Sequence, residues 1–168
     1  MLIEKEHVER ELNLFIDRVV ASARTNLLQH NSSRRLAKSI EGQVDVFRSS
    51  FALEFSMEDY GEFQDKGVSG TKKKYNTPYA YRDKMPPPSS FDKWVVRRGL
   101  AGRNERGQFT SRKSLNFALA KHIFQQGIKP KLFFTEAWEE AFEQLPQDIV
   151  NAYALDVERL MQITLNSK

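Results

Sequence analysis

Two pairs of neighbouring carboxylates are the residues of this sequence best suited to acid–base chemistry. Glu58 directly precedes Asp59, and Glu62 stands three residues before Asp65. Paired carboxylates work as general acid and base only where a pocket moves their pKa values apart. These four residues flank a short turn, and Asp59 is well placed as the N-cap of the helix that follows. The pattern favours a structural role over catalysis, and we expect no enzyme activity.

The histidines and the absence of cysteine argue against a metal centre. His7, His30 and His122 fall in separate predicted elements, and none has a His or carboxylate partner at a ligand spacing. Without cysteine, only His, Asp and Glu remain as ligands, and disulfides and thiolate chemistry are excluded. His122 lies beside Ile123 on a helix face, which is typical of a packed or interfacial histidine. We therefore expect no metal and no cofactor.

A stretch rich in glycine and lysine over 67–74 is the closest approach to a phosphate-binding motif. It reads Gly-Val-Ser-Gly-Thr-Lys-Lys-Lys. A P-loop requires GxxxxGK and then Ser or Thr, between a strand and a helix, and this stretch lacks both the spacing and the helix. It is predicted to be a flexible basic loop, which could contact a DNA backbone through its lysines. Tyr75, Tyr79 and Tyr81 follow it and suit either stacking on single-stranded bases or packing in an edge strand.

Positive charge is concentrated in the middle of the chain and negative charge near its end. The chain carries 26 Lys and Arg against 22 Asp and Glu, a net charge of +4. Residues 136–158 include seven acidic residues and no Lys or Arg. Opposite charges on one chain either attract neighbouring copies or form two solvated faces. The candidate assembly or DNA-channel contacts are Lys66, Lys72, Lys73, Lys74, Arg97, Arg98, Arg103, Arg106, Arg112 and Lys113.

Length and composition indicate one domain that is made in a cytoplasm. The 168 residues, 40% of them hydrophobic, are enough for a single core. No apolar run approaches the roughly 20 residues that span a bilayer, and the charged N-terminal residues are unlike a signal peptide. We expect a soluble protein with no membrane partner.

Hydrophobic periodicity predicts a long helix followed by a β-hairpin. Apolar residues recur at three- and four-residue steps over 3–28, on one face of an amphipathic helix. A shorter helix over 34–40, capped by Ser32 or Ser33, is expected next. Residues 44–57 then alternate between apolar and polar around a turn at 48–50, which is typical of two antiparallel strands. The apolar face of the long helix consists of Val8, Leu12, Phe15, Ile16, Val19, Ala23 and Leu27.

The second half of the sequence alternates helices with loops rich in proline, glycine and basic residues. The expected elements are a helical turn over 59–66, an edge strand over 75–81, a helix over 91–98 capped by Ser89 or Ser90, a helix from Ser111 or Ser114 to Gly127, and helices over 132–145 and 148–165 divided by Pro146. Loops 66–76 and 100–112 are expected to be mobile in the free protein. The fold class is α+β, a small antiparallel β-sheet with a long N-terminal helix and several packed helices.

Four aromatic residues are predicted to anchor the core: Trp94, Phe133, Phe134 and Trp138. Trp94 and Trp138 lie in apolar helical patterns, so packing is favoured over a ligand platform. Trp94 is expected to be buried beside Phe91 and the Phe133–Phe134 pair, so that Trp94→Ala would cost about 3–5 kcal/mol.

Over 60–137 the order and spacing of particular residues resemble a known family. The order is Tyr60…Phe63…Asp65…Gly67, then Pro87-Pro88…Phe91…Trp94…Arg98-Gly99, then Leu115…Ala118…Ala120…Ile123…Gly127-Ile128…Pro130…Phe133-Phe134…Ala137. This pattern resembles the neck or tail-completion proteins of tailed bacteriophages, the small head–tail connectors that are related to minor tail proteins.

The resemblance implies a structural protein of the virion with no cofactor. It would form a homo-oligomeric ring of 12 or 6 subunits in the neck, between portal or adaptor and tail proteins, around the channel that DNA crosses. Residues 1–146 would be the connector-like domain, with the acidic amphipathic helix over 147–168 as part of the same unit. The residues themselves leave open a second class, a cytoplasmic nucleic-acid-binding protein that uses the basic loops 66–74 and 93–113.

Overall fold

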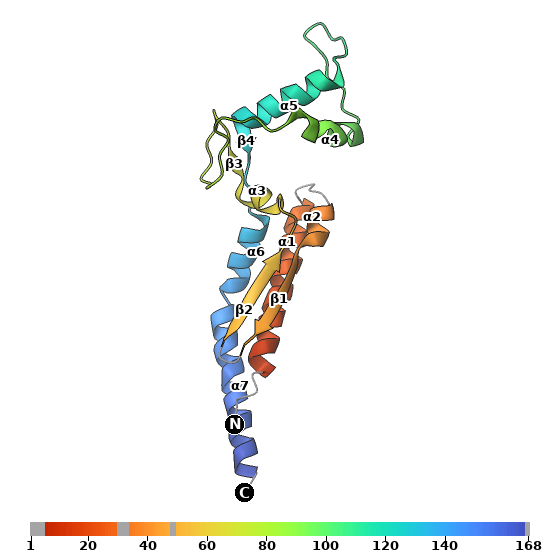
Figure 1. Cartoon of the computed structure of the whole chain (residues 1–168). Coiled ribbons are helices and arrows are strands. Elements are labelled where there is room, and N and C mark those ends of the chain that lie inside the picture. Colours follow the sequence, from red (N-terminus) through yellow and green to blue (C-terminus); the bar gives the residue numbers. More distant parts are fainter. Residues whose placement is uncertain (1–5, 30–33, 48–49, 167–168) are drawn as a thin grey trace. The chain divides into compact units, whose positions relative to one another are not determined.

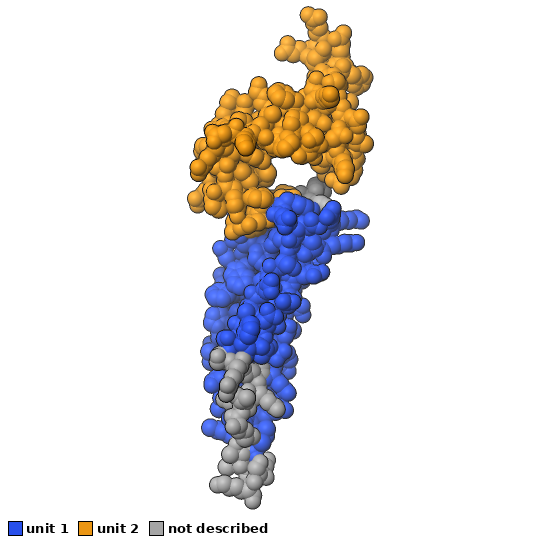
Figure 2. Space-filling model, viewed as in Figure 1, with its two compact units in different colours: residues 1–61, 132–168 blue, residues 62–131 orange. Residues whose placement is uncertain are grey.

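The chain forms two compact units, shown in different colours in Figure 2. The computed structural model describes residues 6–29, 34–47 and 50–166. Unit 1 consists of residues 1–61 and 132–168, and unit 2 consists of residues 62–131. The structure thus divides the chain at 61 and 131 rather than at 146. Residues 147–166 belong to unit 1 together with the N-terminal helix.

The long N-terminal helix is confirmed as the centre of unit 1. Helix α1 (Glu6–Gln29) buries the seven apolar residues that the three- and four-residue spacing placed on one face. Helices α6 (Phe133–Phe142) and α7 (Leu145–Asn166) both pack along α1 (Figure 1). The short helix α2 (Arg34–Ser39) adds Leu36 and Ala37 to the core, and its proposed serine caps lie outside the described residues.

A two-stranded antiparallel sheet covers part of this helical core, as the alternating pattern predicts. Strand β1 (Glu41–Val46) pairs with β2 (Phe51–Ser56), so that Val44 lies opposite Leu53. The inward side chains of the hairpin pack against the α1 cluster. Phe55 makes edge-to-face contacts with Phe134 and Trp138, at ring-centroid distances of 5.3 and 5.6 Å. The predicted turn at 48–50 lies mostly outside the described residues.

Three of the four predicted anchors belong to this core, and the fourth does not. Phe133 is fully buried, Phe134 packs against the core, and Trp138 meets Phe15 edge to face at 5.1 Å. Trp94 is 39% exposed and lies in unit 2, so its prediction as a buried anchor is wrong. The helix that carries it has six residues, and its buried position is the next residue, Val95.

Pro146 lies in the first turn of the last helix and does not precede its start. Helix α7 starts at Leu145, two residues after α6 and its C-cap, and not at Asp148 as predicted. Proline is tolerated in the first turn because the N–H groups there have no partner within the helix. The acidic C-terminal helix is therefore longer than the sequence pattern indicated.

In unit 2, a short pair of strands follows two helices, one strand after each helix. Helix α3 (Gly61–Lys66) leads into β3 (Val68–Ser69), which pairs antiparallel with β4 (Gly127–Ile128) at the end of α5 (Arg112–Gln126). The expected edge strand over 75–81 is reduced to one bridge between Ala80 and Ser69.

The two expected serine caps in unit 2 have different outcomes. Ser111 Oγ accepts a hydrogen bond from the Ser114 backbone N–H at 3.2 Å, which confirms the predicted start of α5. Ser89 and Ser90 do not cap a helix over 91–98. They lie within a 3₁₀ helix, η1 (Pro88–Phe91), and α4 (Asp92–Arg97) follows it without a side-chain cap.

Candidate assembly and nucleic-acid surface

The net charge is positive in one of the two units and negative in the rest of the chain. Unit 2 holds 16 Lys and Arg against 5 Asp and Glu, a net charge of +11, whereas the rest of the chain holds 10 against 17, a net charge of −7. All ten predicted contact cations lie in unit 2 and are exposed. The basic middle and acidic end of the sequence thus become a cationic unit and an anionic unit.

About half of these cations are engaged within unit 2. Lys66 pairs with Glu62 at 2.9 Å, one helical turn away. Lys74 Nζ donates to the Gly70 carbonyl oxygen at 2.9 Å, and Lys73 lies over the Tyr75 ring. Further along the chain, Arg103 donates to the Gly107 carbonyl at 3.0 Å and lies over the Phe109 ring. Arg112 lies 3.4 Å from the Asp92 carboxylate, so these five side chains already have local partners.

The side chains of the other five predicted contact cations have no partner among the described residues. They are Lys72, Arg97, Arg98, Arg106 and Lys113. Arg97 and Arg98 end α4, while Lys113 lies in the first turn of α5. Exposed cations that are not paired within their own chain can meet an anionic partner without first losing an ion pair.

The basic loop over 67–74, called the lysine loop below, is attached to the end of α5 by backbone hydrogen bonds. The N–H groups of Thr71, Lys72 and Lys73 donate to the carbonyl oxygens of Phe124 and Gln125 at 2.9–3.1 Å. The last carbonyls of a helix have no partner within it, so the loop supplies their missing donors. Lysine charge beside a helix C-terminus is also favourable. The sequence offered no signal for this attachment, because it joins residues about 50 positions apart.

The tyrosines after this loop are engaged in packing. Tyr79 and Phe63 meet edge to face with ring centroids 4.8 Å apart, and Tyr81 contacts Phe124 at 6.1 Å. Burial raises the pKa of Tyr81. A hydrogen bond to Glu62 raises the pKa of Tyr79. Of the two alternatives that the sequence left open, the structure supports packing for this pair, although the edge strand itself is not formed.

Glu58 and Glu62, one member of each carboxylate pair, have partners within the chain. Hydrogen bonds from Tyr79 and then from Lys66 lower the pKa of Glu62, which keeps this exposed carboxylate charged rather than available as an acid. Glu58 forms an ion pair with Arg35 at 2.8 Å. No group of three or more potential metal ligands occurs within residues 6–29, 34–47 and 50–166. None of the helices described in that part of the chain is both long and apolar enough to span a membrane.

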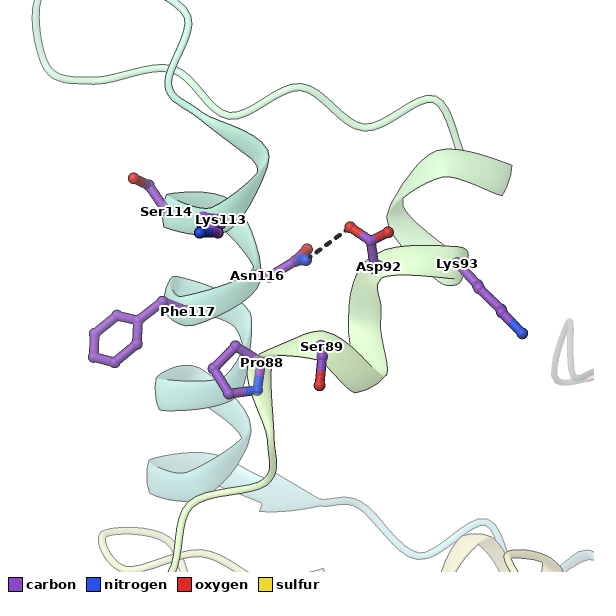
Figure 3. Close-up of a pocket in the computed structure, with 8 residues that line it drawn as sticks. All are labelled: Pro88, Ser89, Asp92, Lys93, Lys113, Ser114, Asn116 and Phe117. Atoms are coloured by element: carbon purple, nitrogen blue, oxygen red, sulfur yellow. Dashed lines mark hydrogen bonds between the residues drawn. The ribbon is translucent and has the colours of Figure 1, made fainter.

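Unit 2 also contains an open groove that the sequence patterns did not indicate (Figure 3). It has a volume of ≈ 950 Å³ and lies between η1–α4 on one side and the first two turns of α5 on the other. In its wall, Asn116 Nδ2 donates to Asp92 Oδ1 at 3.1 Å. Asn116 Oδ1 is buried and has no hydrogen-bond partner among the described residues. The groove is lined by Pro88, Ser89, Asp92, Lys93, Lys113, Ser114, Asn116 and Phe117.

No model of a known protein family matches this sequence, and no curated protein or solved structure matches it either.

Proposed function

We propose that this chain is a structural virion protein of a tailed bacteriophage, a head–tail connector or tail-completion protein. It would form a ring in the neck between portal and tail. The observation that supports this most directly is the separation of charge between a cationic and an anionic unit of one chain. The order of residues over 60–137 that resembles the neck proteins supplies the class.

Charge separation of this kind suits a ring. In a ring each subunit offers one face to a different face of the next subunit, so opposite charges on the two faces attract at every contact. In this proposal the anionic unit meets the cationic unit of the neighbouring copy, and the remaining cations face portal, adaptor or tail proteins, or DNA in the channel. No cofactor takes part.

The composition of purified particles tests the proposal. Quantitative mass spectrometry of virions is expected to find the chain at 12 or 6 copies per particle. Particles assembled without it are expected to have filled heads and no attached tail. A chain that is absent from virions, or present at a copy number that is not a multiple of six, would overturn the proposal.

A second function, cytoplasmic nucleic-acid binding by loops 66–74 and 93–113, is favoured by the five cations without partners. When binding depends on phosphate contacts, the logarithm of the binding constant falls linearly with the logarithm of the salt concentration. The slope is about −0.9 for each phosphate neutralised. The isolated chain would then bind duplex DNA with a steep salt dependence, and replacing Arg97 and Arg98 by Ala would reduce the slope. Tight, salt-sensitive binding to DNA by a chain that is absent from virions would select this second function.

A further inference from the structure

Helix α7 carries an apolar stripe that is largely exposed among the described residues. Val150, Tyr153 and Met161 are 62%, 52% and 61% exposed. Val157 lies between them at helical spacing and is half-buried. Residues three and four positions apart share one face of a helix, so these four side chains form a continuous stripe. The core-facing side of α7 is a different one, which buries Leu145, Ala152 and Asp156.

The charges around this stripe are all negative. Glu143, the exposed C-cap residue of α6, precedes the stripe in the chain. Glu158 lies beside Met161, which is three residues further along α7. No Lys or Arg occurs between residues 136 and 158. A partner for the stripe must therefore be apolar in its centre and cationic at its rim.

The groove of unit 2 has this character. Phe117, which is 53% exposed, and Pro88 supply apolar surface, and Lys93 and Lys113 supply positive charge on opposite sides (Figure 3). The two lysines come from α4 and α5, which the Asn116–Asp92 hydrogen bond joins at 3.1 Å, so a helix lying over both elements would have a cation on each side. An amphipathic helix binds in such a groove through anchors at i, i+3, i+4 and i+7, and Val150, Tyr153 and Val157 have this spacing.

We propose that α7 of one copy of this chain docks in the α4–α5 groove of a second copy. The apolar stripe would meet Phe117 and Pro88, while Glu143 and Glu158 would face Lys113 and Lys93. This contact joins two different surfaces, so it repeats from copy to copy and closes into a ring if the rotation allows. The inference deepens the proposed function by naming the surfaces that join neighbouring subunits.

Site-directed cross-linking tests the contact, because the natural chain has no cysteine. Ser89→Cys, in the groove, and Ala154→Cys, beside the stripe, are made as separate variants, since both side chains are exposed and neither is an anchor of the proposed contact. A short bismaleimide cross-linker is expected to give dimers when the two variants are mixed and only traces when each is treated alone. Because each variant has a single cysteine, a cross-link within one chain is impossible. Leu14→Cys, an exposed residue of α1, serves as the control and is expected to cross-link with neither variant.

Charge-reversal variants supply the second measurement. Adding Lys93→Glu and Lys113→Glu to the Ser89→Cys chain is expected to reduce the dimer yield about tenfold, since like charges across an interface repel. Adding Glu143→Lys and Glu158→Lys to the Ala154→Cys chain is expected to restore the dimer yield. Lys121→Glu, an exposed cation of α5 outside the groove, is the matched control and is expected to leave the yield unchanged.

Each outcome decides the inference. Dimers from Ala154→Cys alone would indicate that α7 pairs with α7, and the absence of dimers from the mixture would show that the groove does not receive α7. Either result overturns the inference. Virions with 12 or 6 copies but no cross-link between the variants would overturn this contact and leave the proposed function standing. Cross-linking of a chain that is absent from virions would support this contact and overturn the proposed function.

Discussion

At the scale of single residues, the contact between His7 and Asp156 ties the last helix to the first. Asp156 is buried on α7, and its Oδ1 lies 2.7 Å from His7 Nδ1. The same carboxylate accepts the backbone N–H groups of His7 and Val8 at 3.1 and 3.2 Å. Burial alone would raise the pKa of Asp156, but the hydrogen bonds from His7 and Val8 outweigh it, and the pKa is lowered. A negative charge at this end of α1 also suits the helix dipole.

This contact predicts a stability term that disappears in acid. A carboxylate whose folded-state pKa is lowered stabilises the fold above its unfolded pKa, about 3.9 for Asp. That contribution is lost as the pH falls through the lower folded pKa. Asp156→Asn is expected to reduce the free energy of unfolding by about 1–3 kcal/mol at neutral pH, with a smaller difference from the parent below about pH 4.

Urea denaturation of parent and variant at several pH values measures the difference. Asp148→Asn is the matched control, because Asp148 also joins α7 to α1 through a partly exposed ion pair with Arg18 at 3.2 Å. Its expected cost is about 0–1 kcal/mol. Equal costs for the two variants would show that burial of Asp156 is not what makes its contact strong.

Trp94 and Phe133, both predicted from the sequence to be core anchors, are expected to contribute differently to stability. Trp94 is 39% exposed, so Trp94→Ala is expected to cost well below the 3–5 kcal/mol that the sequence pattern indicated. Phe133 is fully buried, and Phe133→Ala is expected to cost about 3–5 kcal/mol. Thermal melts of both variants compare them directly. A larger loss for Trp94→Ala would mean that Trp94 is covered in the folded protein.

At the scale of elements, the β3–β4 pair depends on close approach of two backbones. Gly127 has φ 75° and ψ −165° at the end of α5, a conformation that only glycine adopts readily. A Cβ at this position would also clash with the Val68 carbonyl oxygen across the pair. Gly107 has nearly the same φ, 76°, but a Cβ there would meet open space.

The two glycines therefore separate backbone strain from steric clash. Gly107→Ala is expected to cost about 1–2 kcal/mol at most, from the positive φ alone. Gly127→Ala adds the clash and is expected to cost at least about 2 kcal/mol more. Urea denaturation of each variant measures the cost. Similar costs for the two variants would mean that the strand pair can shift to accommodate a side chain.

The lysine loop (67–74) and the loop over 100–112 are expected to differ in the rate of amide hydrogen exchange. The amides of Thr71, Lys72 and Lys73 donate to the end of α5, so they are expected to exchange slowly. Those of Ala101 and Glu105 have no backbone acceptor among the described residues and are expected to exchange fast. Replacing Lys72, Lys73 and Lys74 by Ala leaves the backbone donors in place, so protection is expected to remain. Fast exchange in both loops would restore the expectation that the two are equally mobile.

At the scale of the whole molecule, the two units have very different cores. Both clusters of buried apolar residues lie in unit 1. In unit 2, the buried apolar residues among those described are Val68, Val95 and Ala120. Stability depends on the apolar surface that a unit buries, so unit 2 is expected to unfold at a lower urea concentration than unit 1.

The two tryptophans allow this to be measured, since Trp94 lies in unit 2 and Trp138 in unit 1. Trp138→Phe leaves a fluorescent reporter of unit 2, and Trp94→Phe leaves a reporter of unit 1. The Trp94 signal is expected to change first as urea rises, with circular dichroism following Trp138. Coincident transitions would indicate that the chain unfolds as one cooperative unit.

The sequence alone determined the local structure of this protein. The buried face of α1 follows from apolar residues at three- and four-residue steps, and the hairpin follows from strict alternation. The start of α5 at Ser111 follows from a cap only three residues from its donor. These features depend on neighbours within a few positions, so residue type and spacing are sufficient to predict them.

Tertiary structure decided the contacts between distant residues. Burial of Asp156 depends on a helix end 149 residues away, and attachment of the lysine loop depends on carbonyls at the end of α5. Trp94 became exposed because a helix of six residues has little room for a buried face, and unit 2 packs Val95 instead. The groove between α4 and α5 likewise arises from the packing of two helices, which no local pattern of apolar residues encodes. The division of charge between two units could be read as a trend along the sequence. That it separates two compact bodies was decided by where the chain leaves unit 1 and returns to it.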